Sequence, residues 1–142
     1  MESKRIVRAA AAQLTPVLFD RDGGTRKVLE TIADAGRQGV QLLVFPETFI
    51  PNYPYFANWQ RPATIGDLHL RLFQESVDIP GPVTQAVGAA AAAADMVVVL
   101  GVNERDGGSL YNTQVVFDAD GTLLLKRRKL MPTFHERMIW GW

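Results

Sequence analysis

The sequence predicts an α/β fold in which strands and helices alternate before the chain turns to a β-meander. Three observations support this class. Apolar stretches at residues 6–14, 41–45 and 96–102 have the length and composition of strands. The segments between them include one with apolar residues at helical spacing and one rich in alanine. After residue 102, turn sequences separate short apolar stretches, which is typical of antiparallel strands.

The first half of the chain predicts a βαβ unit. Residues 6–14 are rich in isoleucine, valine and alanine, and we expect a buried strand there. Residues 20–24 indicate a turn, and residues 25–38 a helix that stops at Gly39. Residues 41–45 form a continuous apolar run, which is typical of a strand covered on both faces.

Residues 46–62 contain four prolines among five aromatic residues, which indicates a structured loop without a long regular element. The remaining elements are expected as a short helix at 67–75, a helix from Gly81-Pro82 to Ala94, and strands at 96–102, 110–117 and 122–126. The turns at 106–108 and 118–121 make the last three strands a meander.

Composition narrows the function classes. A length of 142 residues suits one domain, and 15 basic residues balance 15 acidic ones, so we expect no nucleic-acid or membrane partner. There is no cysteine and there are only two histidines, His69 and His135, which argues against a disulfide framework, a thiolate metal site or a zinc site. The start of the chain, residues 1–12, is a poor signal peptide, and Asp95 interrupts the longest apolar run, so we expect a cytoplasmic protein.

Glu47 is the first candidate for chemistry, because it follows a predicted buried strand, where α/β sheets bind ligands. A carboxylate among Phe45, Pro46 and Phe49 is expected to be partly removed from water, which raises its pKa and suits a general base. The alternative is a loop glutamate that caps a neighbouring group or faces water.

Lys129 is the second candidate. On charge alone, the run Lys126-Arg127-Arg128-Lys129 predicts a solvated basic patch or a phosphate-binding edge. The apolar residues that follow could instead turn Lys129 inward, as a fixed cation for a developing negative charge.

Glu136 is the third candidate, and by itself it is an ordinary charged residue. The default expectation for it is a surface ion pair with Arg137 or another cation. His135 could act as a base, although a lone histidine is weak support.

Two longer motifs change this balance. Residues 45–54 (FPETFIPNYP) resemble the glutamate motif of the nitrilase superfamily of carbon–nitrogen hydrolases. Residues 128–133 (RKLMPT), followed by His135-Glu136-Arg137 and Trp140-Gly141, resemble its lysine motif in the nitrilase branch. The two motifs occur in the expected order, about 80 residues apart, and together are far more specific than either alone.

The resemblance implies the N-terminal portion of an α–β–β–α sandwich, with residues 1–142 as a partial carbon–nitrogen hydrolase domain. It also implies a Glu-Lys-Cys triad in which Glu47 is the general base and Lys129 stabilises the tetrahedral intermediates. Glu136 matches a second glutamate beside the triad, and Tyr53 matches an aromatic position near the substrate pocket. No cofactor or metal is implied.

The implied reaction converts a nitrile to a carboxylic acid and ammonia through a thioimidate on the cysteine. Members of this family are about twice as long, and their cysteine lies beyond the position of Trp142. We therefore expect the chain to be inactive alone, with one sheet face uncovered. The implied partners are a small nitrile substrate and, in the full-length form, further copies of the protein. The alternative is an inactive fragment or assembly partner of a full-length nitrilase.

Overall fold

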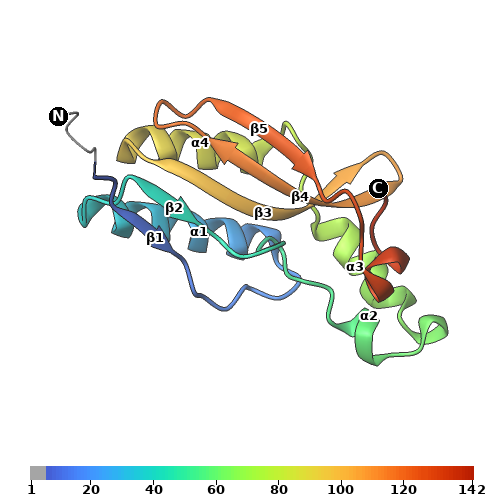
Figure 1. The fold of residues 1–142 in the computed structure, drawn as a ribbon. Coiled ribbons are helices and arrows are strands. Elements are labelled where there is room, and N and C mark those ends of the chain that lie inside the picture. The colour runs from blue at the N-terminus through green and yellow to red at the C-terminus, as the bar shows by residue number, and fades with distance from the viewer. Residues whose placement is uncertain (1–5) are drawn as a thin grey trace.

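A computed structural model describes residues 6–142, and the expectation for the first five residues of the chain lies outside the described part. Five strands form one sheet in sequence order, as Figure 1 shows. The strands are β1 (Ala9–Ala11), β2 (Leu42–Val44), β3 (Val97–Asp106), β4 (Ser109–Phe117) and β5 (Leu123–Arg128).

The helices are α1 (Arg21–Arg37), α2 (Phe56–Trp59), α3 (Gly66–Glu75) and α4 (Pro82–Ala94), with 3₁₀ helices η1 (Pro62–Thr64) and η2 (Phe134–Met138). Within residues 6–142, none of these helices has the length and apolar character needed to cross a membrane.

The pairing of the strands confirms the predicted order of units. β1 pairs with β2 in parallel, and α1 connects the two strands. β2 pairs with β3 in parallel, and the longer connection between them ends with α4. β3, β4 and β5 then pair in antiparallel order, which is the predicted meander. The turn between β3 and β4 places Gly107 at φ +57°, a conformation that glycine adopts without steric cost.

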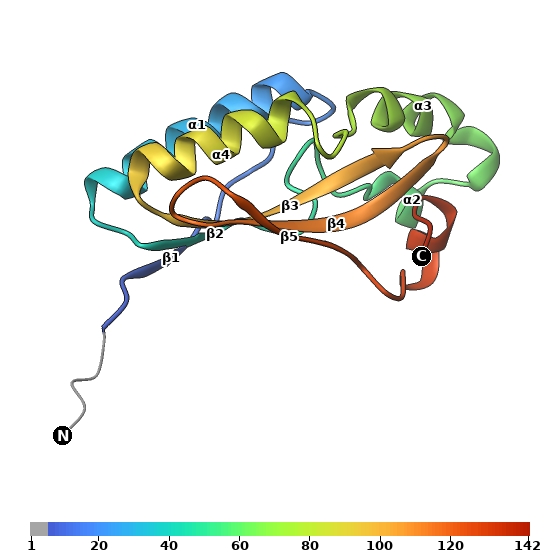
Figure 2. The same cartoon turned by 90° about the horizontal axis from the view of Figure 1, so that it is seen from above.

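The two long helices lie side by side on one face of the sheet (Figure 2). Val28 and Ile32 of α1 and Val87 of α4 are fully buried against Leu43 and Val98 of the sheet. This apolar contact supplies most of the core, because burial of each such side chain contributes about 1.5–3 kcal/mol.

The opposite face of the sheet carries no helix in the described part of the chain (Figure 2). Leu42, Val44, Val97 and Val99 point to that face and are half-buried. The prediction that β2 is covered on both faces is therefore wrong for these residues, while the predicted uncovered face is confirmed.

Two element predictions need correction at the N-terminal side. The strand expected over residues 6–14 is reduced to β1, and Ile6 is 92% exposed, because β1 is an edge strand. Helix α1 begins at Arg21 and not at residue 25, because Asp20 accepts a hydrogen bond from Gly23 N at 2.7 Å and caps the helix. The predicted turn over residues 20–24 is thus the cap and first turn of α1.

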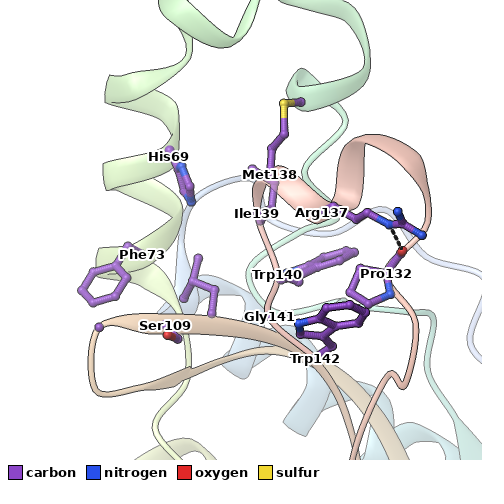
Figure 3. A pocket seen from close by; sticks show the side chains of 12 residues that line it. His69, Phe73, Ser109, Pro132, Arg137, Met138, Ile139, Trp140, Gly141 and Trp142 are labelled. Carbon is purple, nitrogen blue, oxygen red and sulfur yellow. Dashed lines mark hydrogen bonds between the residues drawn. The ribbon is translucent and has the colours of Figure 1, made fainter.

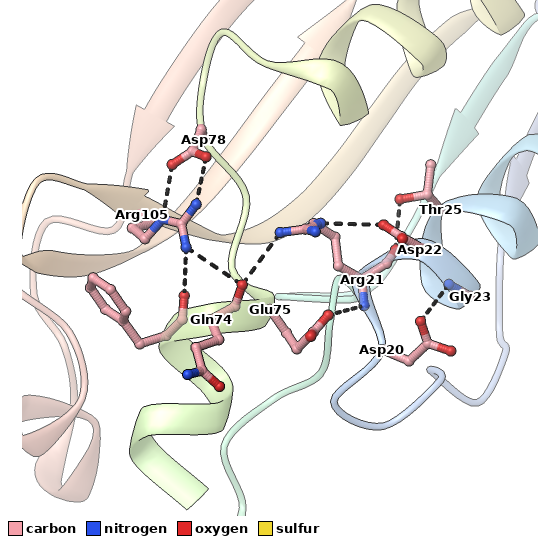
Figure 4. A network of polar contacts seen from close by, with 10 residues as sticks. Asp20, Arg21, Asp22, Gly23, Thr25, Gln74, Glu75, Asp78 and Arg105 are labelled. Atoms are coloured by element: carbon pink, nitrogen blue, oxygen red, sulfur yellow. Dashed lines mark hydrogen bonds and ion pairs between the residues drawn. The ribbon is translucent and has the colours of Figure 1, made fainter.

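A network of polar contacts ties α1 and α3 to β3 (Figure 4). Glu75 accepts a hydrogen bond from Arg21 N at 2.9 Å, which joins the end of α3 to the start of α1. Arg105 of β3 binds Asp78 through two hydrogen bonds of 3.0 and 2.6 Å and donates to the carbonyl of Phe73 at 3.3 Å. Arginine at a helix C-terminus satisfies carbonyls that lack a partner within the helix.

A second, smaller apolar cluster holds α2, α3 and η2 against the β3–β4 hairpin, as their positions in Figure 1 also show. Its buried members include Leu72 of α3, Leu110 of β4 and Trp140 after η2. This cluster brings the segment after β5 close to the loop after β2, and so brings the two sequence motifs together.

Candidate active site

Glu47 lies in the turn directly after β2, and this turn passes over Gly101 of β3. A Cβ atom at Gly101 would lie 2.6 Å from Thr48 N, so the position has room only for glycine. Thr48 has φ +42°, which turns the chain sharply after Glu47. The backbone around Glu47 is therefore fixed by β3 and not by the loop alone.

Lys129 follows β5, and its side chain turns inward. This agrees with the expectation of a fixed cation and not with that of a solvated basic patch. Its backbone N–H donates to the carbonyl of Asn112 at 2.8 Å and continues the ladder for one more residue. Its Nζ donates to Glu47 Oε1 at 3.0 Å and to Glu136 Oε1 at 2.9 Å. One ammonium group thus joins two carboxylates that are far apart in the sequence.

Glu136 lies in η2 and is only 6% exposed, so the expected surface ion pair with Arg137 is wrong. Its Oε1 also accepts a hydrogen bond from Tyr53 Oη at 2.7 Å, and its Oε2 accepts one from Thr133 N. Arg137 instead donates to the carbonyl of Pro132 at 3.1 Å. All four residues predicted for the site, Glu47, Tyr53, Lys129 and Glu136, therefore lie within one hydrogen-bonded group.

The ionisation of the group follows from these contacts. Burial by itself lowers the pKa of Lys129, but its hydrogen bonds to Glu136 and Glu47 outweigh that effect, so the pKa is raised. For Glu136, burial by itself raises the pKa, and the hydrogen bonds from Thr133, Lys129 and Tyr53 reverse this and lower it. Burial and the contact with Glu136 raise the pKa of Tyr53. At neutral pH the group holds an ammonium, a charged Glu136 and a neutral phenol.

Asn112 of β4 belongs to the same group and was not predicted as a site residue. Its Nδ2 donates to Glu47 Oε1 at 2.5 Å, so that oxygen accepts hydrogen bonds from both Asn112 and Lys129. No group in the described chain donates to Glu47 Oε2. The tripeptide Tyr111-Asn112-Thr113 is the signal that could have identified Asn112, because it lies opposite the lysine motif in the meander.

Glu47 is less buried than predicted, since its side chain is 47% exposed. It lies between two hollows, one of about 270 Å³ and one of about 190 Å³. The first has a polar lining that includes Gln114, Arg127 and Lys129. The second is mainly apolar and aromatic, with Leu18, Tyr53 and Tyr55 in its wall. The exposure arises because Glu47 lies at the uncovered face of the sheet.

A larger pocket, of about 560 Å³, is lined by none of the four predicted site residues and is shown in Figure 3. His69 of α3, Trp140 and Trp142 are among the side chains that line it. Neither Glu47 nor Lys129 borders it, so we do not assign the chemistry of the site to this pocket. His135, the other histidine, stacks edge-on against Phe134 and lies outside the group.

Two residues of the basic run 126–129 form ion pairs with a buried carboxylate and do not belong to a solvated patch. Lys126 and Arg128 both bind Glu104 of β3, at 2.8 and 2.6 Å, and Glu104 is only 1% exposed. Thr113 donates a further hydrogen bond of 2.6 Å to the same carboxylate. Two of the four cations thus neutralise a buried carboxylate that sequence analysis did not single out, because alternation alone does not mark it as buried.

The described residues contain no cluster of three or more His, Asp or Glu side chains placed to hold a metal ion. The side chains of the group supply two carboxylates, an ammonium, an amide and a phenol. A carboxylate beside an ammonium can move a proton, and the ammonium can stabilise an anion that forms next to it.

The chain belongs to the carbon–nitrogen hydrolase family, whose model, "Carbon-nitrogen hydrolase", matches residues 8–141. Within the family it lies in the nitrilase branch, which confirms the resemblance carried by the two motifs.

Two relatives illustrate the similarity. The chain is 58% identical over 142 residues to a nitrilase of Paraburkholderia phymatum, covering 99% of this chain and 42% of that protein. It is 42% identical over 142 residues to an aliphatic nitrilase of Rhodococcus rhodochrous, covering 99% of this chain and 39% of that protein. The chain thus spans about two fifths of the length of these relatives.

Solved structures confirm the fold class. A mutant of the Nesterenkonia AN1 amidase from the nitrilase superfamily superposes with a TM-score of 0.69 at 18% identity, over 95% of this chain and 47% of that one. A carbon–nitrogen hydrolase from Helicobacter pylori G27 gives a TM-score of 0.66 at 21% identity, over 95% of this chain and 44% of that one.

Proposed function

We propose that the chain supplies the glutamate and the lysine of a nitrilase that converts a nitrile to a carboxylic acid and ammonia. Residues 1–142 then form part of one carbon–nitrogen hydrolase domain, and the nucleophilic cysteine comes from outside this sequence. The observation that carries the proposal is the position of Lys129 Nζ, at 3.0 Å from Glu47 and 2.9 Å from Glu136.

In this proposal, Glu47 takes the proton of the cysteine thiol. Glu47 Oε1 is occupied by Asn112 and Lys129, which leaves Oε2 to accept the proton. The thiolate sulfur forms a bond to the nitrile carbon, one π bond of the nitrile breaks, and the nitrogen takes up the proton held by Glu47 to give a thioimidate. One water releases ammonia and leaves a thioester, and a second water releases the carboxylic acid. Lys129 stabilises the negative charge of each tetrahedral intermediate.

In the same proposal, Glu136 holds Lys129 in place. Tyr53 lines the site. Glu136 accepts from Lys129 and from Tyr53, so it fixes the direction of the ammonium. The hollow of about 190 Å³ beside Tyr53 and Tyr55 has apolar walls that suit the hydrocarbon part of a nitrile. Support for a cysteine nucleophile comes from the Nesterenkonia amidase, in one mutant of which acrylamide is added at the active-site cysteine.

The proposal can be tested with a chimera in which this chain replaces the matching segment of the Paraburkholderia phymatum nitrilase. The relative is chosen because it is 58% identical to the chain over 142 residues, which favours a compatible interface. We expect ammonia release from at least one compound in a panel of aliphatic, aromatic and arylaceto nitriles and cyanide. Glu47→Gln and Lys129→Met should each lower the rate by about a hundredfold or more, because each removes a group that acts in the transition state.

The matched control is Glu30→Gln, which removes an exposed carboxylate from α1, far from the sheet edge that carries the site. This variant should keep the activity of the chimera. A folded chimera without activity, or one in which Glu47→Gln is harmless, would overturn the proposal. Sustained ammonia release by the 142-residue chain alone would refute the need for the cysteine.

A second function, assembly with a full-length nitrilase, is favoured by the uncovered face of the sheet. Its apolar side chains would lie against the partner, and such a complex would incorporate a subunit without a nucleophile. A pull-down of the tagged chain against the full-length Paraburkholderia phymatum relative tests this. If the two proteins do not co-purify after co-expression, this second function is rejected.

A further inference from the structure

Asn103 of β3 is a fully buried asparagine that connects four segments of the chain. Its backbone N–H donates to Ile50 O, and its backbone carbonyl accepts from Val77 N, both at 2.8 Å. Its side chain donates to Asn52 O through Nδ2 and accepts from Trp140 Nε1 at Oδ1, again both at 2.8 Å. A single residue therefore contacts both loops that carry the site.

The two partners of the side chain lie next to site residues. Asn52 directly precedes Tyr53. The backbone N–H of Trp140 donates to the backbone carbonyl of Glu136 at 2.8 Å. The ring of Tyr53 packs edge-on against Trp140, with centroids 5.5 Å apart, and its hydroxyl donates to Glu136. Asn103, Asn52, Tyr53, Glu136 and Trp140 thus form a closed ring of contacts that includes one side of the candidate site.

We propose that Asn103 is a positioning residue, whose side-chain amide sets the distance between the loop that carries Tyr53 and the helix that carries Glu136. The effect on catalysis rests on the proposed nitrilase function, whereas the positioning itself does not. An amide fits this position because its nitrogen donates to a carbonyl while its oxygen accepts from an indole. A leucine offers neither contact, and a carboxylate cannot donate to Asn52 O at neutral pH.

The consequence for the site follows from the hydrogen bonds of Glu136. If the Tyr53 loop moves outward, Glu136 Oε1 loses the phenol and keeps only Lys129. The ammonium then shifts from its shared position toward Glu136 and away from Glu47, because a carboxylate with fewer donors binds it more strongly. The same movement lets water reach Tyr53, whose pKa is raised by burial and by Glu136.

The test follows Tyr53 directly by fluorine NMR of the chain labelled with fluorotyrosine. The chain has three tyrosines, so the Tyr53 signal is the one that is missing from Tyr53→Phe. We expect Asn103→Asp and Asn103→Leu to move this signal toward its position in the unfolded chain and to leave the signal of Tyr111 in place. The chimera described above serves for the same measurement if the chain alone self-associates.

The matched control is Val98→Ala, which opens a cavity in the core on the same strand but touches none of the ring contacts. It should lower stability without moving the Tyr53 signal. Equal movement in Val98→Ala and in the Asn103 variants would overturn the proposal, since the role of Asn103 would then be general stability.

A second measurement is the hydrogen exchange of the Trp140 indole proton. In Asn103→Leu we expect exchange at least about tenfold faster, because the buried N–H has lost its acceptor. In Asn103→Asp the acceptor remains, so the indole should stay protected while the Tyr53 signal moves. Unchanged exchange and an unmoved Tyr53 signal in both variants would reject the inference. Neither result depends on nitrile turnover, so failure of the proposed function would show separately in the chimera assay.

Discussion

Gly101 is the residue of β3 over which the Glu47 turn passes, and it gives the first prediction. In Gly101→Ala the new Cβ would lie 2.6 Å from Thr48 N and 3.0 Å from Glu47 C, so the turn must move. We expect a loss of stability of about 1–3 kcal/mol, as for overpacking elsewhere, measured as a lower thermal midpoint.

Gly108 provides the control for this prediction, because a Cβ built there meets no atom within 4 Å. Gly108→Ala should change the stability by no more than about 0.5 kcal/mol. Equal thermal midpoints for the two alanine variants would show that the turn does not depend on Gly101.

Asn112 gives a prediction about Glu47 itself. Asn112→Leu removes the 2.5 Å hydrogen bond to Glu47 Oε1, so the carboxylate is held by Lys129 alone and is free to rotate. In the chimera we expect nitrile turnover to fall about tenfold or more, since a misplaced base transfers its proton poorly. Gln114→Leu, two residues along the same face of β4, is the control and should keep the activity. A similar loss in both variants would contradict a specific role for Asn112.

At the residue scale, the sequence motifs identified Glu47, Lys129 and Glu136, because each lies in a long local pattern. Asn112 was missed because its contact with Glu47 spans 65 positions in the sequence. Asn103 was missed for the same reason, since its side chain contacts residues 51 and 37 positions away. Local spacing carries no information on such contacts until the register of the sheet is known.

At the scale of elements, Glu104 joins β3 to β5 through Lys126 and Arg128, and this contact predicts a pH dependence. Burial by itself raises the pKa of Glu104, but hydrogen bonds from Arg128, Lys126 and Thr113 lower it from 4.5 to about 2. A carboxyl whose pKa is lowered on folding stabilises the protein above its unfolded value, and that contribution is lost as pH falls from 4.5 toward 2. The contribution is on the order of 3 kcal/mol.

The measurement is the thermal midpoint as a function of pH, for the chain and for Glu104→Gln. The variant should be less stable at neutral pH and should show a flatter decline between pH 4.5 and 2. Asp106→Asn removes the exposed partner of Arg128 and serves as the control, with an expected loss below about 1 kcal/mol. Parallel pH profiles for the chain and Glu104→Gln would contradict the prediction.

The order of the strands and helices could be predicted from periodicity and turn residues. The start of α1 and the extent of β1 could not. The start of α1 depends on Asp20 as the cap, and on Gly23, where a Cβ would lie 2.8 Å from Cγ of the capping Asp20. Two adjacent glycines suggest a turn when this packing is unknown. β1 is short because only β2 pairs with it in the described part of the chain.

At the scale of the whole molecule, α1 and α4 cover one face of the sheet (Figure 2), and the register of the strands places the candidate site at the other face. Gly101 and Gln114, which line the hollow beside Glu47, alternate along their strands with core residues such as Leu100 and Val115. The structural relative from Nesterenkonia is matched over 47% of its length. The α/β class could be predicted from the periodicity of this sequence, whereas the uncovered face of the sheet was expected only from the family resemblance.

The uncovered face leads to the last prediction, which concerns self-association of the 142-residue chain. Val44, Val97 and Val99 are half-buried there, and Leu125 on β5 is 46% exposed on the same face. A contiguous apolar sheet face in water favours association between copies, so size-exclusion chromatography with light scattering should show oligomers at micromolar concentration. Val99→Lys combined with Leu125→Lys should shift the chain toward the monomer, because charged side chains resist burial between two sheets.

Trp59→Lys is the control, since Trp59 is 84% exposed on α2, away from the sheet, and its replacement should leave the oligomers unchanged. A monodisperse monomer in the unmodified chain, or equal effects of both sets of substitutions, would show that the uncovered face does not drive association.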